Sequence, residues 1–267
     1  MLIYCVSDIH SFYTPLKKAL DEKGFQENSE DHLLVVLGDV FDRGEETVEV
    51  LQYLDSLTNV VLVRGNHEDL LEEVWYRGYY LGHDNKNGTK KTIQTIFHKY
   101  TDVAPYTPIE VSEKVLRPFL NKFVDYYESA SYIFCHSWLP CKVHFDGEGE
   151  FWPWFIRNKT YEYRPDWREA NEVEWQEARW GNPFRMAEAS LNQTGKVICT
   201  GHWHCSAGWA MEEGRSEFGE DAKWDIYTDS AHGVIFLDKC TAHTGEVNVV
   251  VIEDDLLPAE AFTNETV

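Results

Sequence analysis

Short apolar runs alternate with amphipathic stretches over the first 65 residues. Residues 2–6, 33–37 and 60–63 are aliphatic runs, which predicts three buried strands. Between them, apolar residues at 48, 50, 51 and 54 recur at helical spacing over residues 45–57. Thr14, Pro15 and Gly24 are suitable N-cap, first-turn and stop residues for an earlier helix. This order predicts a βαβαβ unit, in which parallel strands are covered by helices.

The rest of the chain is expected to contain further strands separated by two long insertions. Strands are predicted at 131–135 and 196–200, and near 224–228, 233–238 and 246–252. Residues 69–130 have a mostly helical pattern with a polar break at 82–89, whereas residues 139–195 are irregular and rich in Trp. We therefore expect a single domain over residues 1–267 with these two insertions, and an acidic tail from Glu253 that frays.

Side chains that bind metals or transfer protons follow five of the predicted strands. They lie in the segments DIH at 8–10, GDVFDRG at 38–44, GNHE at 65–68, a single His at 136, and GHWH at 201–204. The carboxyl ends of strands in an α/β sheet are where ligands and catalytic groups gather. We therefore expect these five segments to converge on one site.

The residue types in these segments indicate a metal centre. The candidate ligands are Asp8, His10, Asp39, Asn66, His136, His202 and His204. Carboxylate, amide and imidazole donors without thiolate suit Mn²⁺, Fe or Zn²⁺. Seven ligands are too many for one ion that must also bind water, and they fit two ions that share a carboxylate. Such a pair can generate a hydroxide and hold both oxygens of an in-line phosphoryl displacement.

The five segments resemble the signature blocks of the calcineurin-like metallophosphoesterases. GDVFDRG with GNHE resembles, more narrowly, the branch of serine/threonine phosphoprotein phosphatases and symmetrical diadenosine-tetraphosphate hydrolases. The resemblance covers residues 1–70, 131–137 and 196–252, and it does not extend to the two insertions. It implies an α/β (α+β) fold, in which central mixed β-sheets form a two-sheet sandwich flanked by helices.

The resemblance also implies a role for each residue. Two metals, with Mn²⁺ expected and Fe or Zn²⁺ as alternatives, would bind Asp8, His10 and His204 on one side and Asn66, His136 and His202 on the other, with Asp39 bridging. Arg43 and Asn66 would hold the substrate phosphate. His67 would protonate the leaving oxygen, with Asp42 holding its imidazole. The residues suit these roles, because a carboxylate raises the pKa of a neighbouring His and guanidinium binds phosphate bidentately.

Two departures from the pattern leave the substrate class open. Phosphoprotein phosphatases usually have one His in the last block, whereas this chain has His202 and His204, and Ser137 and Trp138 rather than glycines follow His136. We expect a phosphomonoesterase of the serine/threonine phosphoprotein phosphatase type, using a metal-bridging hydroxide. A dinucleoside polyphosphate hydrolase or phosphodiesterase is the alternative. A non-enzymatic binding module that kept the fold and lost its metals is the third hypothesis.

The second insertion raises a separate question. Eight of the ten Trp residues lie between positions 138 and 209. They could form a lid that reads a phosphorylated substrate or stacks a nucleobase, or they could pack onto the core, which is the interpretation we favour. Arg179 is our candidate for a second phosphate contact. Asp42 and Arg43 have a competing interpretation as a surface ion pair, and Glu68 is expected only to support the site.

Charge limits the choice of partners. Lys and Arg number 24 and Asp and Glu 46, so the formal net charge is −22. This charge opposes binding to extended nucleic acid or an anionic membrane, and leaves a phosphoprotein, small phosphoester or nucleotide as substrate. The six cysteines form no C-x-x-C pair, no apolar run approaches 18 residues, and the first ten residues are not expected to act as a signal peptide. We therefore expect a cytoplasmic protein, whose two divalent ions invert the local acidic field.

Overall fold

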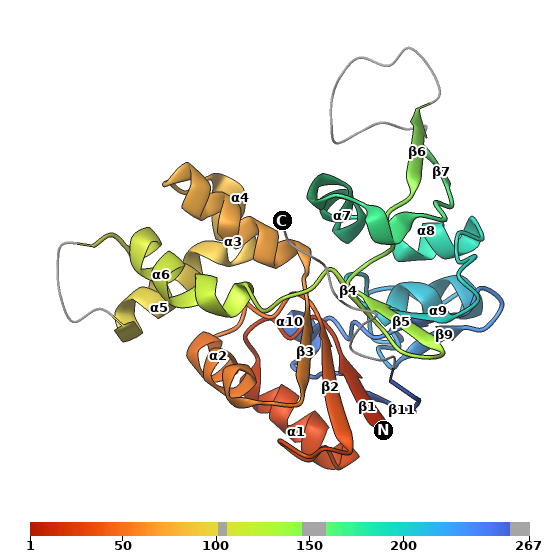
Figure 1. Ribbon diagram of the computed structural model, residues 1–267, viewed down its shortest axis with the longest axis horizontal. Coiled ribbons are helices and arrows are strands. Elements are labelled where there is room, and N and C mark those ends of the chain that lie inside the picture. Colours follow the sequence, from red (N-terminus) through yellow and green to blue (C-terminus); the bar gives the residue numbers. More distant parts are fainter. Residues whose placement is uncertain (101–105, 146–158, 257–267) are drawn as a thin grey trace.

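The computed structural model describes residues 1–100, 106–145 and 159–256, and its centre is a pair of mixed β-sheets (Figure 1). The first sheet has the order β11 (Val250–Glu253), β1 (Leu2–Val6), β2 (His32–Leu37), β3 (Val60–Val63). The second has the order β4 (Tyr126–Glu128), β5 (Tyr132–Cys135), β8 (Val197–Thr200), β10 (Val234–Phe236), β9 (Tyr227–Asp229). Strands β1, β2 and β3 are parallel, as are β5, β8 and β10, which confirms the predicted fold class.

Both faces of the first sheet are buried, which explains its continuous apolar strands. Successive side chains of a strand point to opposite faces, and β1 divides accordingly. Ile3 and Cys5 pack with Phe134 and Cys199 in a core between the two sheets. Tyr4 lies on the other face of the sheet, which packs against helices. These helices are α1 (Tyr13–Lys23), α2 (Thr47–Ser56), α3 (Asn66–Arg77), α5 (Thr89–Tyr100) and α6 (Pro108–Leu120).

The second insertion covers the outer face of the second sheet. It consists of the hairpin β6 (Lys142–Phe145) and β7 (Lys159–Glu162), the short 3-10 helix η1 (Trp167–Glu169), and the helices α7 (Glu172–Arg179) and α8 (Pro183–Glu188). It is therefore more regular than expected. Trp138, Trp167 and Trp175 are buried in one apolar cluster with Ile198, so the packing interpretation holds for these three. Trp152, Trp154 and Arg157 lie outside the described residues.

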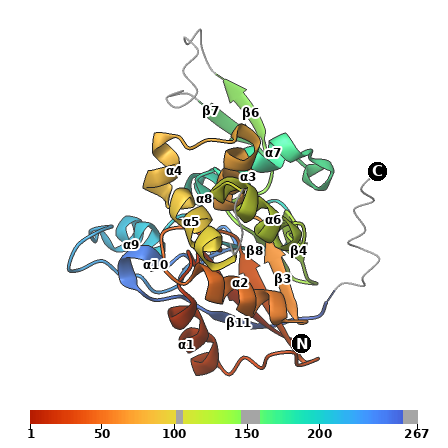
Figure 2. The same cartoon turned by 90° about the vertical axis from the view of Figure 1, so that its left-hand side faces the viewer.

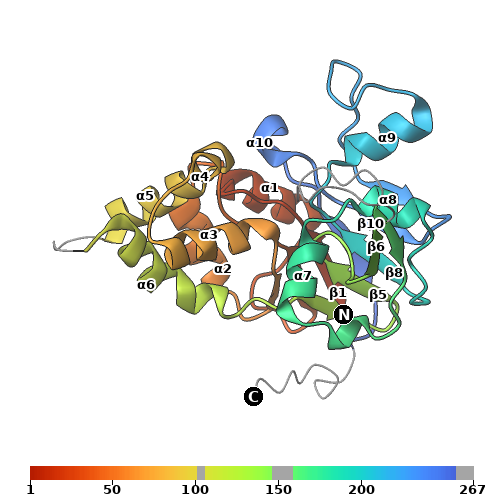
Figure 3. The same cartoon turned by 90° about the horizontal axis from the view of Figure 1, so that it is seen from above.

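The helices α3 to α6, which include α4 (Gly82–Asn87), lie on one side of the strands in Figures 1 and 3, and α8 and the hairpin lie on the other. Helix α7 of the second insertion approaches α3, and Arg179 of α7 donates to Asp69 of α3. The hairpin points away from the sheets (Figure 2). The remaining helices, α9 (Cys205–Glu213) and α10 (Thr241–Thr244), lie along the upper edge of the molecule in Figure 3. None of the helices in the described residues has the length and hydrophobicity needed to cross a bilayer.

Three local predictions need correction or lie outside the structure. Helix α1 begins at Tyr13, so Thr14 is not its N-cap. The Thr14 backbone N–H instead donates to the Glu46 carboxylate at 3.0 Å. The polar break at 82–89 is largely helical, because Asp84 accepts from the Leu81 N–H at 2.5 Å and starts α4 (Gly82–Asn87). Most of the acidic tail, 257–267, lies outside the described residues.

Candidate active site

The five polar segments meet at the carboxyl ends of β1, β2, β3, β5 and β8. Backbone hydrogen bonds join the first two loops, from the Asp8 N–H to the Gly38 carbonyl at 3.3 Å and from the His10 N–H to the Asp39 carbonyl at 2.9 Å. Non-glycine residues with positive φ concentrate here: Asp8, His10, Ser11, Asp39, Asp42, Arg43 and His202. Each such residue costs about 1–3 kcal/mol, and strain of this kind persists mainly at functional sites.

Asp39 is shared by two groups of potential metal ligands. His10, Asp39 and His67 form one group, and Asp39, His136 and His202 form the other, with the ligand atoms of each group within 4.8 Å of one another. One Asp39 oxygen lies 3.7 Å from His10 Nε2, and its other oxygen lies 3.4 Å from His136 Nε2. This arrangement fits a carboxylate that bridges two ions.

Backbone carbonyls prepare the two imidazoles that flank Asp39. His10 Nδ1 lies 3.0 Å from the Phe41 carbonyl and His136 Nδ1 lies 2.7 Å from the Leu37 carbonyl, which places the proton on Nδ1. His10 Nε2 is left without a hydrogen-bond partner although His10 is only 1% exposed. An unpaired buried nitrogen is costly unless a further group binds it. A carbonyl that fixes Nδ1–H and frees Nε2 is the usual support of a metal-binding His.

Burial keeps His10 and His202 neutral. It lowers the pKa of His10 well below its usual value, an effect that Arg43 reinforces. It also lowers the pKa of His202 to about 3, with His136 contributing. A neutral imidazole offers the lone pair that a metal needs.

Asp8 completes the cluster from β1. Its Oδ2 accepts from the His202 N–H at 2.9 Å and from the Ser7 hydroxyl. Gly201 is required for this contact, since a Cβ there would lie 2.3 Å from the same oxygen. Burial raises the pKa of Asp8 to about 6 and raises that of Asp238 well above its usual value, with Asp8 contributing. Burial makes the ionised form of these carboxyl groups unfavourable, and cations beside them would offset that cost. The donor set therefore fits two divalent ions.

His67 lies beside the cluster, with both ring nitrogens engaged. Its Nδ1 lies 2.7 Å from an Asp42 oxygen, and Arg43 Nη2 lies 3.1 Å from its Nε2. Burial lowers the pKa of His67, but Asp39 and Asp42 outweigh it and the net shift is upward. These contacts fit a proton donor better than a metal ligand. Asp42 makes no ion pair with Arg43 among the described residues, so the surface-pair interpretation is wrong.

Glu68 supports the site through the backbone, as expected. Its carboxylate accepts from the N–H groups of Asp39 and Gly65 at 2.9 Å and of Val40 at 3.0 Å. One buried side chain therefore joins the loops after β2 and β3, which carry the shared carboxylate and Asn66. Asn66 Oδ1 in turn lies 2.9 Å from His136 Nε2.

The structure does not bring His204 into either ligand group. Its ring nitrogens lie 3.9 Å from Asp238 and from Glu217, and its ring contacts Phe218 at a centroid distance of 5.3 Å. His202 belongs to a ligand group, whereas His204 is the N-cap residue of α9, which begins at Cys205. The structure therefore assembles Asp8, His10, Asp39, Asn66, His136 and His202 and leaves His204 at the edge.

Arg179 has a different role from the one predicted. Its side chain is buried, and its guanidinium donates to Asp69 at 2.8 and 3.1 Å and to Asp125 at 2.7 Å, with Glu172 as a third partner. Its donors are occupied by carboxylates that join α3, α7 and the segment before β4. We therefore correct the expectation of a phosphate contact: Arg179 connects the second insertion to the core.

This correction predicts a loss of stability. We expect Arg179→Met to lower the free energy of unfolding by about 3 kcal/mol, because it leaves buried carboxylates uncompensated. Thermal unfolding measures the effect. Arg185→Met is the matched control, since Arg185 is exposed on α8 and forms no ion pair with a described residue. An unchanged melting temperature with an increased KM would instead support a phosphate contact.

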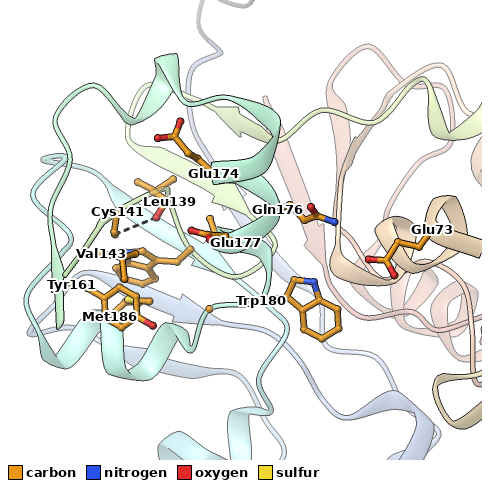
Figure 4. Close-up of a pocket in the computed structure, with 13 residues that line it drawn as sticks. Glu73, Leu139, Cys141, Val143, Tyr161, Glu174, Gln176, Glu177, Trp180 and Met186 are labelled. Atoms are coloured by element: carbon orange, nitrogen blue, oxygen red, sulfur yellow. Dashed lines mark hydrogen bonds between the residues drawn. The ribbon is translucent and has the colours of Figure 1, made fainter. Parts of the chain in front are cut away.

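A pocket of about 390 Å³ is lined mainly by residues of the second insertion (Figure 4). Its wall runs from Glu73 on α3 to Trp180, and Leu139 and Met186 belong to its apolar part. Trp180 is 46% exposed, and its ring centroid lies 6.2 Å from that of His202. The pocket therefore adjoins the cluster through Trp180.

Sequence reasoning did not find the partners of Asp42 on the first insertion. Thr89 and Thr92 on α5 each donate to the Asp42 carboxylate at 2.7 Å. No motif marks them, because both lie outside the five polar segments. Asp238, which lies outside the five segments, is buried beside His204.

Comparison with known proteins agrees with this arrangement. A family model described as calcineurin-like phosphoesterase matches residues 1–206. Over 69 residues the chain is 44% identical to the symmetrical bis(5'-nucleosyl)-tetraphosphatase of Pseudomonas fluorescens (strain SBW25) and 38% identical to that of Buchnera aphidicola subsp. Baizongia pistaciae (strain Bp). The match covers 26% of this chain and 24% of each relative, about a quarter of their length. A solved cold-active protein tyrosine phosphatase has a TM-score of 0.53 at 14% identity, covering 94% of this chain and 73% of that one, and shares the fold.

Proposed function

The chain belongs to the calcineurin-like phosphoesterase family, and we propose that it is a two-metal phosphomonoesterase of the serine/threonine phosphoprotein phosphatase type. The observation that carries the proposal is the position of Asp39 between two imidazole groups, with Arg43 exposed beside them. Oxygen and imidazole donors without thiolate favour Mn²⁺, with Fe or Zn²⁺ as alternatives. The ions would be held by Asp8, His10, Asp39, Asn66, His136 and His202, with His204, which lies 3.9 Å from Asp238, as the seventh proposed ligand.

The protein groups around the ions divide the remaining work. Two bound divalent ions supply Lewis acidity, which lowers the pKa of water and neutralises phosphoryl charge. Arg43 is exposed and its guanidinium can bind two phosphate oxygens, while the Asn66 amide can donate to a third. Phosphate is a stronger partner for guanidinium than neutral imidazole, so substrate binding would release His67 Nε2 from Arg43. His67, in the imidazolium form that its raised pKa favours, would then give its Nε2 proton to the leaving oxygen, with Nδ1–H held by Asp42.

A second candidate function is hydrolysis of dinucleoside polyphosphates or of phosphodiesters. The identity to symmetrical bis(5'-nucleosyl)-tetraphosphatases supports it, and the pocket beside Trp180 offers an aromatic face for a base. The proposed substrate is therefore a phosphoprotein, a small phosphoester or a nucleotide. The net charge of −22 opposes extended nucleic acid.

One panel of substrates tests the proposal. The protein is stripped with EDTA and resupplied with Mn²⁺. Its kcat/KM is then measured on p-nitrophenyl phosphate, bis-p-nitrophenyl phosphate, a phosphoserine peptide and diadenosine tetraphosphate. A phosphomonoesterase prefers the first and third substrates. Preference for the second or fourth favours the alternative, and a protein that neither retains metal nor responds to it is the binding module.

Replacement of Trp180 tests the role of the pocket. We expect Trp180→Ala to raise KM for diadenosine tetraphosphate by about 10-fold with a small change in kcat, because stacking of a base contributes about 1–3 kcal/mol. Steady-state kinetics on this substrate and on inorganic phosphate as a competitive inhibitor measure the effect. Tyr76→Ala removes an exposed aromatic of α3 that does not line the pocket and serves as control. An unchanged KM would exclude Trp180 from substrate binding.

We also propose a single domain over residues 1–267 and a cytoplasmic location. The insertions share apolar clusters with the two sheets, which supports one folding unit. All six cysteines are free, which suits a reducing compartment.

A further inference from the structure

Asp42 is held by an unusually complete set of donors from the first insertion. Thr92 Oγ1 donates to Asp42 Oδ1 and Thr89 Oγ1 donates to Asp42 Oδ2, both at 2.7 Å, and the Asp42 N–H donates back to Thr92 Oγ1 at 3.0 Å. Thr89 and Thr92 are 0% and 1% exposed. The same Oδ2 lies 2.7 Å from His67 Nδ1. The carboxylate thus has one orientation, in which it faces the His67 ring.

The start of α5 also packs directly on the Asp42–Arg43 backbone. A Cβ at Gly88 would lie 2.3 Å from the Arg43 nitrogen, so only glycine allows this approach. Lys91 Nζ donates to the Arg43 carbonyl at 3.0 Å. Asp42 and Arg43 both have positive φ, at 74° and 62°, a conformation that surrounding contacts must hold.

We propose that α5 positions the chemistry: Thr89 and Thr92 aim Asp42 at His67, and Gly88 and Lys91 hold the Arg43 backbone. This inference rests on the proposed phosphoester hydrolysis. A proton donor needs a fixed tautomer and ring orientation, and a freely rotating Asp42 carboxylate would supply neither. The first insertion therefore contributes residues that position the site. The groups proposed to bind metal, to bind phosphate and to transfer a proton all lie in other segments.

Removal of the two hydroxyls tests the inference. Thr89→Val with Thr92→Val keeps the side-chain shape, whereas Thr89→Ser with Thr92→Ser keeps the hydroxyls. With Mn²⁺ present, we expect the Val pair to lower kcat about 10-fold or more on phenyl phosphate, a poor leaving group, and less than about 3-fold on p-nitrophenyl phosphate, at unchanged KM. The Ser pair should retain most activity on both. Equal losses on the two esters, or a Ser pair as slow as the Val pair, would overturn the inference.

A measurement without turnover separates this inference from the proposed function. The side-chain ¹⁵N signals of His67, assigned through His67→Gln, report its tautomer. With the ring in its neutral state, we expect the single Nδ1–H tautomer in the wild type and the Ser pair, and a mixture of the two tautomers in the Val pair. An unchanged His67 signal in the Val pair would refute positioning even if the wild type is inactive on every ester. If the Val pair does not fold, the single variant Thr92→Val is compared with Thr92→Ser by the same signal.

Discussion

We expect Asp39→Asn to lower metal-dependent kcat on p-nitrophenyl phosphate by at least about 10³-fold. Asp39 belongs to both ligand groups, so removal of its charge weakens the binding of both ions at once. Metal ions contribute several kcal/mol to transition-state stabilisation, and each 1.4 kcal/mol corresponds to about 10-fold in rate. Elemental analysis of bound metal and the kinetics of Mn²⁺ activation measure the effect.

Thermal unfolding supplies a second readout for Asp39. A ligand that binds only the folded state raises its stability, so Mn²⁺ should raise the melting temperature of the wild type and not that of Asp39→Asn. Asp254→Asn is the control, because Asp254 lies near the opposite end of β1, beside Met1. A variant of Asp39 that keeps most activity, or still binds two ions, would show that the two-metal proposal is wrong.

The second large effect is expected from His67→Ala. Its kcat should fall by about 10²–10⁴ on phenyl phosphate, whose leaving oxygen needs a proton, and by less than about 10-fold on p-nitrophenyl phosphate. The physical reason lies in the pKa values of the histidines. Asp39 and Asp42 raise the pKa of His67, whereas burial lowers the pKa of His10 and of His202. A series of aryl phosphates with increasing leaving-group pKa measures the difference as a slope.

Asp42→Asn provides the matched comparison for His67. It keeps the size of the side chain but removes the charge that orients the His67 ring. The loss of kcat should therefore again increase with the leaving-group pKa, but each loss should be smaller than in His67→Ala. Equal losses of His67→Ala on all esters would exclude the proton-donor role. Such a result would favour the alternative that His67 binds metal, since it lies within one of the two ligand groups.

The fold could be predicted where neighbouring residues alone determine it. Strand β3 has the predicted bounds Val60–Val63, and β1 has the predicted bounds Leu2–Val6. Both are continuous apolar runs, since both faces of their sheet are covered. The beginning of α1 was less predictable, because Thr14 can cap a helix or bond to Glu46, and Glu46 is 32 residues away.

Two comparisons show where motif reasoning ends. Arg43 and Arg179 have the same side chain, but Arg43 is exposed at the site and Arg179 is enclosed by carboxylates from three segments. His202 and His204 are two positions apart, yet only His202 joins a ligand group. In both cases the surroundings come from distant parts of the chain.

The sequence by itself determined the alternation of strands and helices in the first 65 residues, the family resemblance and the set of polar residues at strand ends. These three properties depend on local periodicity and on short spacings between residues that are close in the sequence. Only the tertiary structure decided that Thr89 and Thr92 hold Asp42, that Arg179 is a structural connection and that Trp180 borders a pocket. The physical reason is that hydrogen bonding and burial depend on which distant side chains meet, and packing brings them together without leaving a pattern in the sequence.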